Sequence, residues 1–326
     1  MASAGEAQWW FGYGAQFDAA GRYEAAFDAF ARGNALRRAS LDPQGYLQAV
    51  DRTLNANMAF CTPAFLHEHQ GRGHPSRAPI FIIGMPRSGS TLIEQILIAH
   101  RHVEGFGECN AIHEAIAGRA PFQVDTPDHF RRLGARYLDA LRARGWQGSR
   151  RVVDKTLANY LAAPLLRLIF PRSTIIHATR HPLDTCLSIF MRNFDELNHA
   201  GFDLTDIAAD YLRYRRVMDR WQALMPGQIV EVEHGALVEA PEAAMRRLIA
   251  AVGLAWDPSC LDLHLARRRA LGGAGEEVRR PLHRAGLGRW RNYRHQLAPL
   301  IEALGPEGGT DPSQSQSPAH PGFPPG

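Results

Sequence analysis

The sequence predicts an α/β protein in which helices cover both faces of a parallel sheet, with a short helical segment before it. Apolar, strand-like runs alternate with helical patterns between about residues 80 and 252, a spacing typical of βαβ units. A glycine-rich turn beginning at Gly84 follows the first of these runs. The 326 residues, 45% of them hydrophobic, suffice for one sizeable core and a smaller module.

The N-terminal part, from residue 9 to about 57, has a helical pattern. Its aromatic and small residues follow the tetratricopeptide (TPR) spacing, namely Trp10, Tyr13, Gly14, Phe17, Tyr23, Ala26 and Phe30. Gly14 and Ala26 would let two helices cross closely, and Gly21 fits the turn between them. One copy is visible, and TPR units bury their faces against stacked neighbours. A lone TPR repeat and a generic helical hairpin therefore both fit.

The main domain alternates strands and helices. Four predicted strands are each followed by a predicted helix: 80–83 by 91–99, 151–154 by 162–170, 173–179 by 182–190, and 228–232 by 241–252. Parallel strands with crossover helices form a sheet that is covered on both faces. Ligands gather at the carboxyl ends of such strands. The side chains expected around that crevice are Arg87, Lys155, Arg180 and His234.

Composition divides the chain into four predicted segments. They are a TPR-like helical segment (1–66), a linker rich in Gly and Pro (67–79), the main domain (80–305) and a tail (306–326). The tail is rich in Pro, Gly, Ser and Gln. It cannot bury enough apolar surface to order itself, so we expect it to be disordered.

Charge and cysteine content argue against several classes of protein. The net charge of +4 and a pI of about 9.0 suit an anionic ligand, but no dense basic tract interleaved with aromatics indicates nucleic-acid binding. Four scattered cysteines without a C-x-x-C pair favour a reducing compartment and no zinc site. We see no signal peptide and no apolar run of about 20 residues. A cytoplasmic protein without a membrane span is therefore expected.

The glycine-rich turn is the strongest chemical signal. A strand, the turn and a helix N-terminus would aim backbone N–H groups at one spot, which suits a phosphate or sulfate. The spacing is G-x-x-x-x-G followed by Ser90 and Thr91, where an ATP-binding P-loop has Lys and then Ser or Thr. Without that Lys, hydrolysis of a nucleoside triphosphate is a poor fit. The predicted anion-binding residues are Arg87, Ser88, Gly89, Ser90 and Thr91.

A second anion site is predicted around Arg180-His-Pro-Leu-Asp184. Arg180 ends a strand, and Ser188 and Arg192 lie one turn apart on the helix that follows. Two arginines and a hydroxyl can bind an oxyanion. Alone, the motif would equally fit a cap in which Asp184 holds Arg180. Taken with the glycine-rich turn, it indicates a ligand with phosphate-like groups at two ends.

Together, the two motifs resemble those of sulfotransferases. The stretch from Gly84 to Thr91 is similar to their 5′-phosphosulfate loop, and that from Arg180 to Arg192 to their 3′-phosphate site. The resemblance covers about residues 9 to 303 and is closest to bacterial TPR-containing sulfotransferases, which are related to the protein-tyrosine sulfotransferases. It implies a P-loop-NTPase-like α/β fold and the donor 3′-phosphoadenosine 5′-phosphosulfate (PAPS). The sulfuryl group would pass to an acceptor hydroxyl, a peptide or protein tyrosine being the acceptor that the relatives suggest.

The resemblance also implies two catalytic residues. Glu108, in Gly-Phe-Gly-Glu, would take the proton of the acceptor hydroxyl. Lys155, in Asp-Lys-Thr, would stabilise the bridging oxygen of the donor in the transition state. The residues around Glu108 by themselves favour a helix-entry cap, whereas Lys155 stands out in a composition whose basic residues are overwhelmingly arginine. No metal is implied, because a sulfuryl group carries less charge than a terminal phosphate.

The chain departs from the family pattern toward its C-terminus. His234 and Gly235 stand where relatives have a Tyr-Glu pair, although His234 could still stack on the donor or hydrogen-bond to it. The glycine-rich stretch 272–275 replaces a hydroxyl that helps the transition state. Arg289 keeps the cation of the family's lid, which also includes the similar stretch 278–281. These changes are expected to affect rate more than donor binding.

Two other readings fit parts of the sequence. A P-loop kinase or another nucleotide enzyme could use Asp154 as a metal-binding carboxylate. A catalytically impaired sulfotransferase-like module could instead recruit a partner through its N-terminal hairpin. The first predicts preference for a nucleoside triphosphate, and the second predicts no turnover. Neither the acceptor nor the oligomeric state is specified by the sequence.

Overall fold

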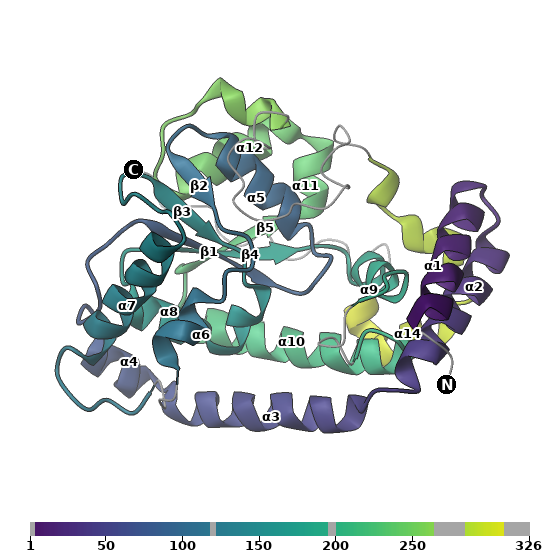
Figure 1. The fold of residues 1–326 in the computed structure, drawn as a ribbon, viewed down its shortest axis with the longest axis horizontal. Helices are drawn as coiled ribbons and strands as arrows, with labels where there is room; N and C mark the ends of the chain where they lie inside the picture. Colours follow the sequence, from purple (N-terminus) through teal and green to yellow (C-terminus); the bar gives the residue numbers. More distant parts are fainter. Residues whose placement is uncertain (1–3, 118–121, 195–199, 264–283, 310–326) are drawn as a thin grey trace. The chain divides into compact units, whose positions relative to one another are not determined.

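The computed structural model describes residues 4–117, 122–194, 200–263 and 284–309 (Figure 1). The chain forms two compact units, each assembled from separate stretches. The sheet unit comprises 48–180 and 214–284, and the hairpin unit comprises 1–47, 181–213 and 285–326. The division falls inside two helices, α3 (Pro43–Phe60) and α10 (Leu204–Leu224).

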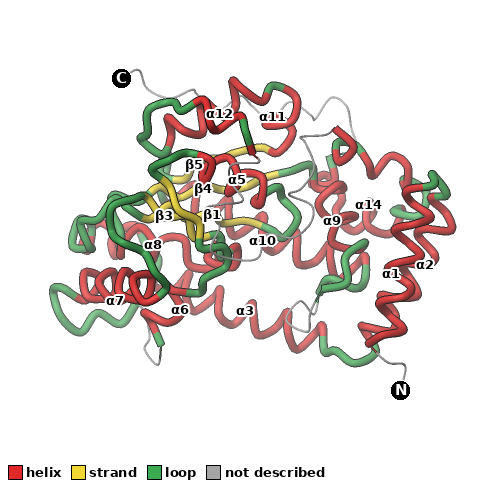
Figure 2. The backbone as a smooth tube through the Cα atoms, turned by 45° about the horizontal axis from the view of Figure 1, so that its top comes forward, coloured by secondary structure: helices red, strands yellow, loops and turns green. Residues whose placement is uncertain are grey.

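The sheet has five parallel strands in the order β2-β3-β1-β4-β5. Figure 2 shows the strands in yellow, surrounded by helices. The strands are β1 (Pro79–Gly84), β2 (Val103–Gly105), β3 (Arg151–Asp154), β4 (Thr174–Thr179) and β5 (Ile229–Glu233). In the register of the sheet, Gly84 pairs with Ala178 and Thr179 pairs with Glu233. The carboxyl ends of β1, β4 and β5 are therefore nearly level, at the edge where ligands of such sheets bind.

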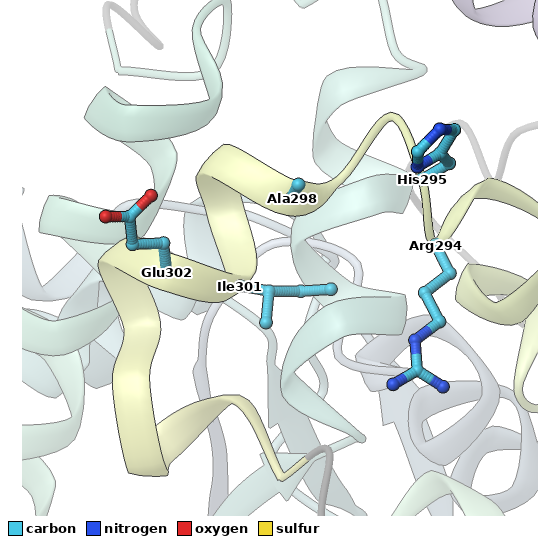
Figure 3. A pocket seen from close by; sticks show the side chains of 5 residues that line it. All are labelled: Arg294, His295, Ala298, Ile301 and Glu302. Carbon is cyan, nitrogen blue, oxygen red and sulfur yellow. The ribbon is translucent and has the colours of Figure 1, made fainter.

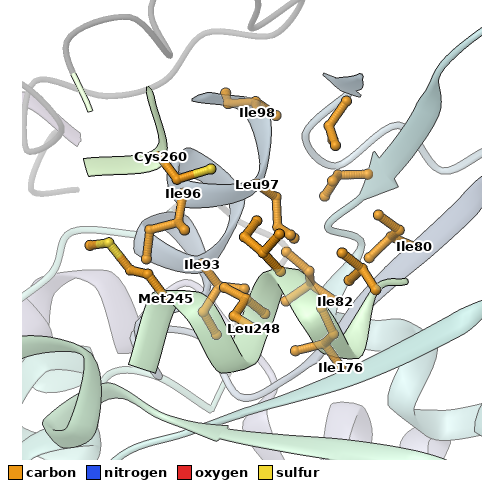
Figure 4. Close-up of a cluster of buried hydrophobic side chains, with 14 of the residues drawn as sticks. Ile80, Ile82, Ile93, Ile96, Leu97, Ile98, Ile176, Met245, Leu248 and Cys260 are labelled. Atoms are coloured by element: carbon orange, nitrogen blue, oxygen red, sulfur yellow. The ribbon is translucent and has the colours of Figure 1, made fainter. Parts of the chain in front are cut away.

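One face of the sheet packs on α5 (Ser90–Ala99) and α12 (Pro241–Ala251). Ile80 and Ile82 of β1 point to this face, as does Ile176 of β4 (Figure 4). The helices contribute a continuous apolar layer against them, including Ile93, Ile96, Leu97, Met245 and Leu248. Side chains alternate between the faces of a strand, so every second residue of β1 belongs to this core.

The opposite face is also covered. The Phe81 ring of β1 lies 5.7 Å from the Tyr137 ring of α7 (His129–Ala143) and 6.1 Å from the Phe170 ring, which follows α8 (Ala163–Ile169). His177 of β4 is hydrogen-bonded to Tyr214 of α10. Because both faces are buried, β1 has the continuous apolar sequence of a central parallel strand. The predicted fold class is thus confirmed.

The predicted strands match β1, β3, β4 and β5 to within a residue or two, and the helix predicted over 182–190 is α9 (Pro182–Phe190). The fifth strand, β2, was not predicted because three residues show no alternation. The other elements of the sheet unit are α4 (Pro63–His69), α6 (Ala111–Ile116), η1 (Leu157–Ala162), α11 (His234–Glu239) and η2 (Pro258–Leu261).

The hairpin unit begins with two packed helices, α1 (Ala4–Ala19) and α2 (Tyr23–Arg38). Gly21 lies in the turn between them with a φ of 72°. At Gly14 a β-carbon would lie 2.6 Å from the Phe30 ring, so only glycine permits this close crossing. The two helices and their turn lie where the pattern put them, and their assignment to the TPR class stays a prediction.

The C-terminal part of this unit consists of short helical pieces: η4 (Arg284–Gly286), η5 (Arg289–Tyr293), α14 (Ala298–Leu304) and η6 (Gly305–Gly308). Two carboxylates hold η5. Asp184 of α9 accepts the backbone N–H groups of Gly288, at 2.7 Å, and Trp290, at 3.0 Å. Asp18 of α1 accepts from Tyr293 at 2.6 Å and pairs with Arg289. Asp184 therefore holds the start of η5, a contact that neither the predicted anion site nor the alternative of a cap on Arg180 included.

Candidate functional site

The glycine-rich turn joins β1 to α5 with an unusual backbone. Arg87 has a φ of 67° and Gly89 a φ of 93°, both in the left-handed region. Gly89 is the residue that precedes the first turn of α5. A left-handed conformation at a residue with a side chain, such as Arg87, costs free energy and is concentrated at ligand sites. The strand, the turn and the helix thus lie where the sequence predicted them.

His234 lies against this turn. A β-carbon at Gly89 would be 2.7 Å from Cδ2 of His234, the first residue of α11 after β5. The backbone conformation and the imidazole ring therefore both require glycine at position 89. The structure brings together two residues that the sequence predicted from separate motifs.

Arg180 also reaches the turn. Its Nη1 donates a hydrogen bond of 3.2 Å to the backbone carbonyl of Arg87. Arg180 comes directly after β4, the neighbour of β1 in the sheet. This contact fixes the Arg180 guanidinium beside the turn that carries Arg87, and guanidinium groups favour an anionic ligand.

A hydroxyl in the turn lacks a partner within the described parts of the chain. Ser88 is 2% exposed, and its Oγ is buried without a hydrogen bond among those residues. Oγ1 of Thr179, at the end of β4, is in the same state. A buried unsatisfied polar group costs about 1–3 kcal/mol. The oxygens of a phosphosulfate would supply the missing partner to Ser88, so the donor set fits the ligand that the motif implies.

Lys155 and Glu108 form an ion pair at the carboxyl ends of β3 and β2. Nζ of Lys155 lies 3.3 Å from Oε1 of Glu108. The lysine side chain is 13% exposed and that of Glu108 is 63% exposed. A sheltered cation thus meets a carboxylate that is open to an incoming molecule. Asn110, rather than Glu108, occupies the cap position of α6. Lys155 is the only lysine in the sequence.

Glu94 of α5 joins this pair and was not predicted. Its Oε2 lies 3.8 Å from Nζ of Lys155, and its Oε1 accepts the backbone N–H of Gly107 at 3.1 Å. Burial raises the pKa of Glu94, and the Lys155 charge and the Gly107 hydrogen bond partly offset this effect. A carboxyl group inside the apolar run of α5 is the sequence signal that could have revealed it.

Asp154 does not suit the metal-binding role that a nucleotide enzyme would give it. The residue is 0% exposed, and its carboxylate accepts from the Tyr137 hydroxyl at 3.2 Å and the Thr156 amide at 2.9 Å. Burial raises the pKa of Asp154, which these hydrogen bonds partly offset. Its bond to Tyr137 of α7 places it on the face opposite α5. Within the described residues, no group of three His, Cys, Asp or Glu side chains could hold a metal ion.

The remaining predicted residues belong to the hairpin unit or lie outside the described residues. Ser188 is in the last turn of α9, and the amide of Arg192 bonds to the Ile189 carbonyl just beyond it. Arg289 is paired with Asp18. The predicted stretches 272–275 and 278–281 are outside the described part of the chain.

A hollow of about 490 Å³ lies on the hairpin unit (Figure 3). Its lining residues are Arg294, His295, Ala298, Ile301 and Glu302. None of them is a predicted site residue.

A family model described as the sulfotransferase family matches residues 79–258. The match covers more than half of the chain and includes the turn, Glu94, Glu108 and Lys155. The chain belongs to the sulfotransferase family. Arg289, Asp18 and the whole N-terminal hairpin lie outside the residues that the family model matches.

Two curated relatives extend the similarity. An uncharacterized protein of Aquifex aeolicus is 31% identical over 301 residues, which are 86% of this chain and 39% of that protein. The chain thus spans about two fifths of that relative. Protein-tyrosine sulfotransferase A of Caenorhabditis elegans is 23% identical over 273 residues, covering 72% of this chain and 68% of that one.

Solved sulfotransferase structures are similar in part. The sulfotransferase domain of the Synechococcus PCC 7002 olefin synthase is 18% identical, with a TM-score of 0.48, and covers 67% of this chain and 88% of its own. A sulfotransferase of Mycobacterium tuberculosis is 14% identical, with a TM-score of 0.44, and covers 73% of this chain and 79% of its own.

Among the described helices, none is both long and apolar enough to cross a membrane.

Proposed function

We propose that this protein is a PAPS-dependent sulfotransferase that acts on an acceptor hydroxyl. The observation that carries the proposal is the ion pair between Lys155 and Glu108, whose charged atoms lie 3.3 Å apart. Glu94 connects this pair to α5, the helix that follows the glycine-rich turn, which we call the anion loop. A base open to solvent and a sheltered cation are what sulfuryl transfer requires at one place.

The donor would be held by the two predicted anion sites. The turn from Arg87 to Thr91 would bind the 5′-phosphosulfate, with the buried Ser88 hydroxyl donating to one of its oxygens. The 3′-phosphate would be bound by Arg180, Ser188 and Arg192, which recognise an oxyanion by charge and hydrogen bonding. His234, packed on the turn, would contact the donor, and Arg289 would supply a further cation.

In the reaction, the acceptor oxygen attacks sulfur in line with the bridging oxygen of the donor. Glu108 accepts the proton of the acceptor hydroxyl as the new S–O bond forms. The bond from sulfur to the bridging oxygen breaks, and its electron pair leaves with the phosphate of adenosine 3′,5′-bisphosphate. The Lys155 ammonium stabilises the charge on that oxygen, most strongly because its side chain is only 13% exposed.

For the acceptor, we propose a tyrosine on a peptide or protein. Support comes from the relative named protein-tyrosine sulfotransferase A. The exposure of Glu108 is consistent with an acceptor hydroxyl on a bulky molecule. A side chain of a peptide or protein can reach an exposed carboxylate without entering a deep channel.

Calorimetric titration with adenosine 3′,5′-bisphosphate, compared with 5′-AMP and Mg-ATP, tests the donor assignment. Micromolar binding that requires the 3′-phosphate would support it and justify a screen of acceptor peptides with ³⁵S-labelled PAPS. Tighter binding of Mg-ATP would overturn the proposal in favour of a nucleotide enzyme. Donor binding without transfer to any acceptor would favour the catalytically impaired module.

A further inference from the structure

Glu94 connects three parts of the proposed site, namely Lys155, the turn that carries Glu108, and the anion loop before α5. It is the fifth residue of α5, the helix that begins directly after the anion loop at Gly89. Its side chain is 8% exposed. A buried carboxylate is costly unless it is paired and hydrogen-bonded, so its retention in an apolar helix face calls for a role.

One carboxylate oxygen of Glu94 holds the turn that carries Glu108. Oε1 accepts the Gly107 amide at 3.1 Å, and the Gly107 carbonyl in turn accepts the backbone N–H of Lys155 at 2.8 Å. Gly107 has a φ of 59°, a conformation that favours glycine. The Glu108 turn and the backbone of Lys155 are thereby both joined to Gly107, through the two peptide groups that flank its α-carbon.

The end of β2 also packs closely on α5. A β-carbon at Gly105 would lie 2.7 Å from Cγ2 of Ile98 and 3.4 Å from Oε1 of Glu94. A side chain at position 105 would push the turn away from the helix. Glycine therefore allows the Gly107 amide to reach the carboxylate.

The other oxygen of Glu94 faces the Lys155 ammonium at 3.8 Å. Charged groups around that ammonium come from three elements: Glu94 from α5, Glu108 from the turn after β2, and the buried Asp154 from β3. Asp154 is turned to Tyr137 and Thr156. Solvent screens the charge of the exposed Glu108. Glu94 is thus the sheltered counter-charge of Lys155.

We propose that Glu94 is a positioning residue that holds Lys155 and the Glu108 turn in one rigid arrangement, anchored to the helix of the anion loop. It binds neither donor nor acceptor. Its charge pairs with the ammonium, and its hydrogen bond sets the position of the turn that carries Glu108. The kinetic part of this inference rests on the proposed sulfuryl transfer, whereas the effect on Lys155 does not.

The single lysine allows a direct test without turnover. Lysine labelled with ¹³Cε and ¹⁵Nζ gives one side-chain signal, because Lys155 is the only lysine in the sequence. In Glu94→Gln the pH titration of this signal should differ from that of the wild type, because the ammonium loses the opposite charge that faces it at 3.8 Å. Glu104→Gln is the matched control, since Glu104 pairs with Arg150 at 3.0 Å.

Kinetics with saturating PAPS tests the positioning. Glu94→Gln should lower kcat about tenfold or more, with affinity for adenosine 3′,5′-bisphosphate within about twofold of the wild type. An unchanged titration of Lys155 would overturn the proposal. So would a loss of bisphosphate affinity equal to the loss of kcat, because that would mean general damage to the loop.

Glu94→Asp keeps the test decisive if Glu94→Gln folds poorly. The shorter carboxylate retains the charge but not the reach to both partners. It should leave the Lys155 titration nearer to the wild type than Glu94→Gln does, and a shift as large as that of Glu94→Gln would contradict the electrostatic role. If the wild type neither binds the bisphosphate nor transfers sulfate while the Lys155 titration still responds to Glu94→Gln, the proposed function fails and the ion-pair role stands.

Discussion

His234 packs on Gly89 so closely that a β-carbon at position 89 would lie 2.7 Å from Cδ2 of the imidazole. The contact joins the start of α11 to the residue that caps α5. The loop and the residue after β5 therefore form one surface. A change at either position is expected to alter the proposed donor site.

Gly89→Ala should remove donor binding. The left-handed φ of 93° costs a residue with a side chain about 1–3 kcal/mol, and the new methyl group would collide with His234. Calorimetry with adenosine 3′,5′-bisphosphate should show affinity reduced at least tenfold. In Gly89→Ala/His234→Ala the collision is absent but the backbone strain remains, so affinity should recover only in part. Wild-type affinity of Gly89→Ala would contradict the structure of the turn.

Arg180→Ala should weaken binding of the 3′-phosphate. Hydrogen bonds to a charged group contribute about 1.5–3 kcal/mol, so the affinity for adenosine 3′,5′-bisphosphate should fall about 10- to 100-fold while that for 5′-AMP changes little. Arg150→Ala, which removes a guanidinium paired with Glu104, is the control. Equal losses for both nucleotides would refute the assignment of Arg180 to the 3′ site.

Glu108→Gln should reduce turnover without affecting donor binding. A positioned general base contributes about 10²–10⁴-fold, and the glutamine keeps the size of the side chain. Single-turnover assays with PAPS should show this loss, with bisphosphate affinity unchanged. Glu114→Gln, a carboxylate of α6 paired with Arg144, is the matched control. Wild-type turnover of Glu108→Gln would require another base.

His177 should make the sheet unit sensitive to acid. It is 0% exposed and hydrogen-bonded to Tyr214, and burial lowers its pKa to about 3. A depressed pKa means that the folded state binds fewer protons than the unfolded state. Stability from neutral His177 is therefore present above about pH 6.5 and is lost as pH falls toward 3, by about 1.4 kcal/mol for each pH unit.

Urea denaturation at pH 7 and pH 5 checks this expectation. The wild type should lose about 2 kcal/mol between the two, and His177→Gln, which can still form a hydrogen bond with Tyr214, should lose distinctly less. His295→Gln, an exposed histidine, should behave like the wild type. Equal acid sensitivity of His177→Gln and the wild type would show that other groups cause the loss.

Asp184→Asn should loosen the C-terminal part of the hairpin unit. Asp184 is 2% exposed and accepts two backbone N–H groups. An asparagine has one acceptor oxygen, so one amide would be left unsatisfied at a cost of about 1–3 kcal/mol. Limited proteolysis should cleave near residues 284–294 faster than in the wild type. Glu302→Gln on α14 is the control. Cleavage of Asp184→Asn at the wild-type rate would show that Asp184 does not stabilise the turn.

Local patterns predicted the elements that carry the site. The Gly84 turn, Lys155 after β3 and Arg180 after β4 each follow an apolar strand, so their place at one sheet edge follows from parallel topology. Glu94 was missed because its partners lie 13 and 61 residues away and depend on the packing of β2 on α5. No composition pattern reports such a contact.

The hairpin unit shows the same limit on a larger scale. Its stretches 1–47, 181–213 and 285–326 are far apart in sequence. Asp18 meets Arg289 and Tyr293 across more than 270 residues. The aromatic spacing of α1 and α2 predicted that helices would form there. The sequence has many arginines and carboxylates, and no pattern in it indicates which of them form an ion pair in the folded chain.

The single lysine makes covalent chemistry at this site unusually selective. A reagent for primary amines meets only the terminal α-amino group and the ammonium of Lys155. Label incorporated beyond one mole per mole of protein therefore reports modification of Lys155 in the proposed active site. Protection of that second equivalent by adenosine 3′,5′-bisphosphate would measure occupancy before any acceptor is known.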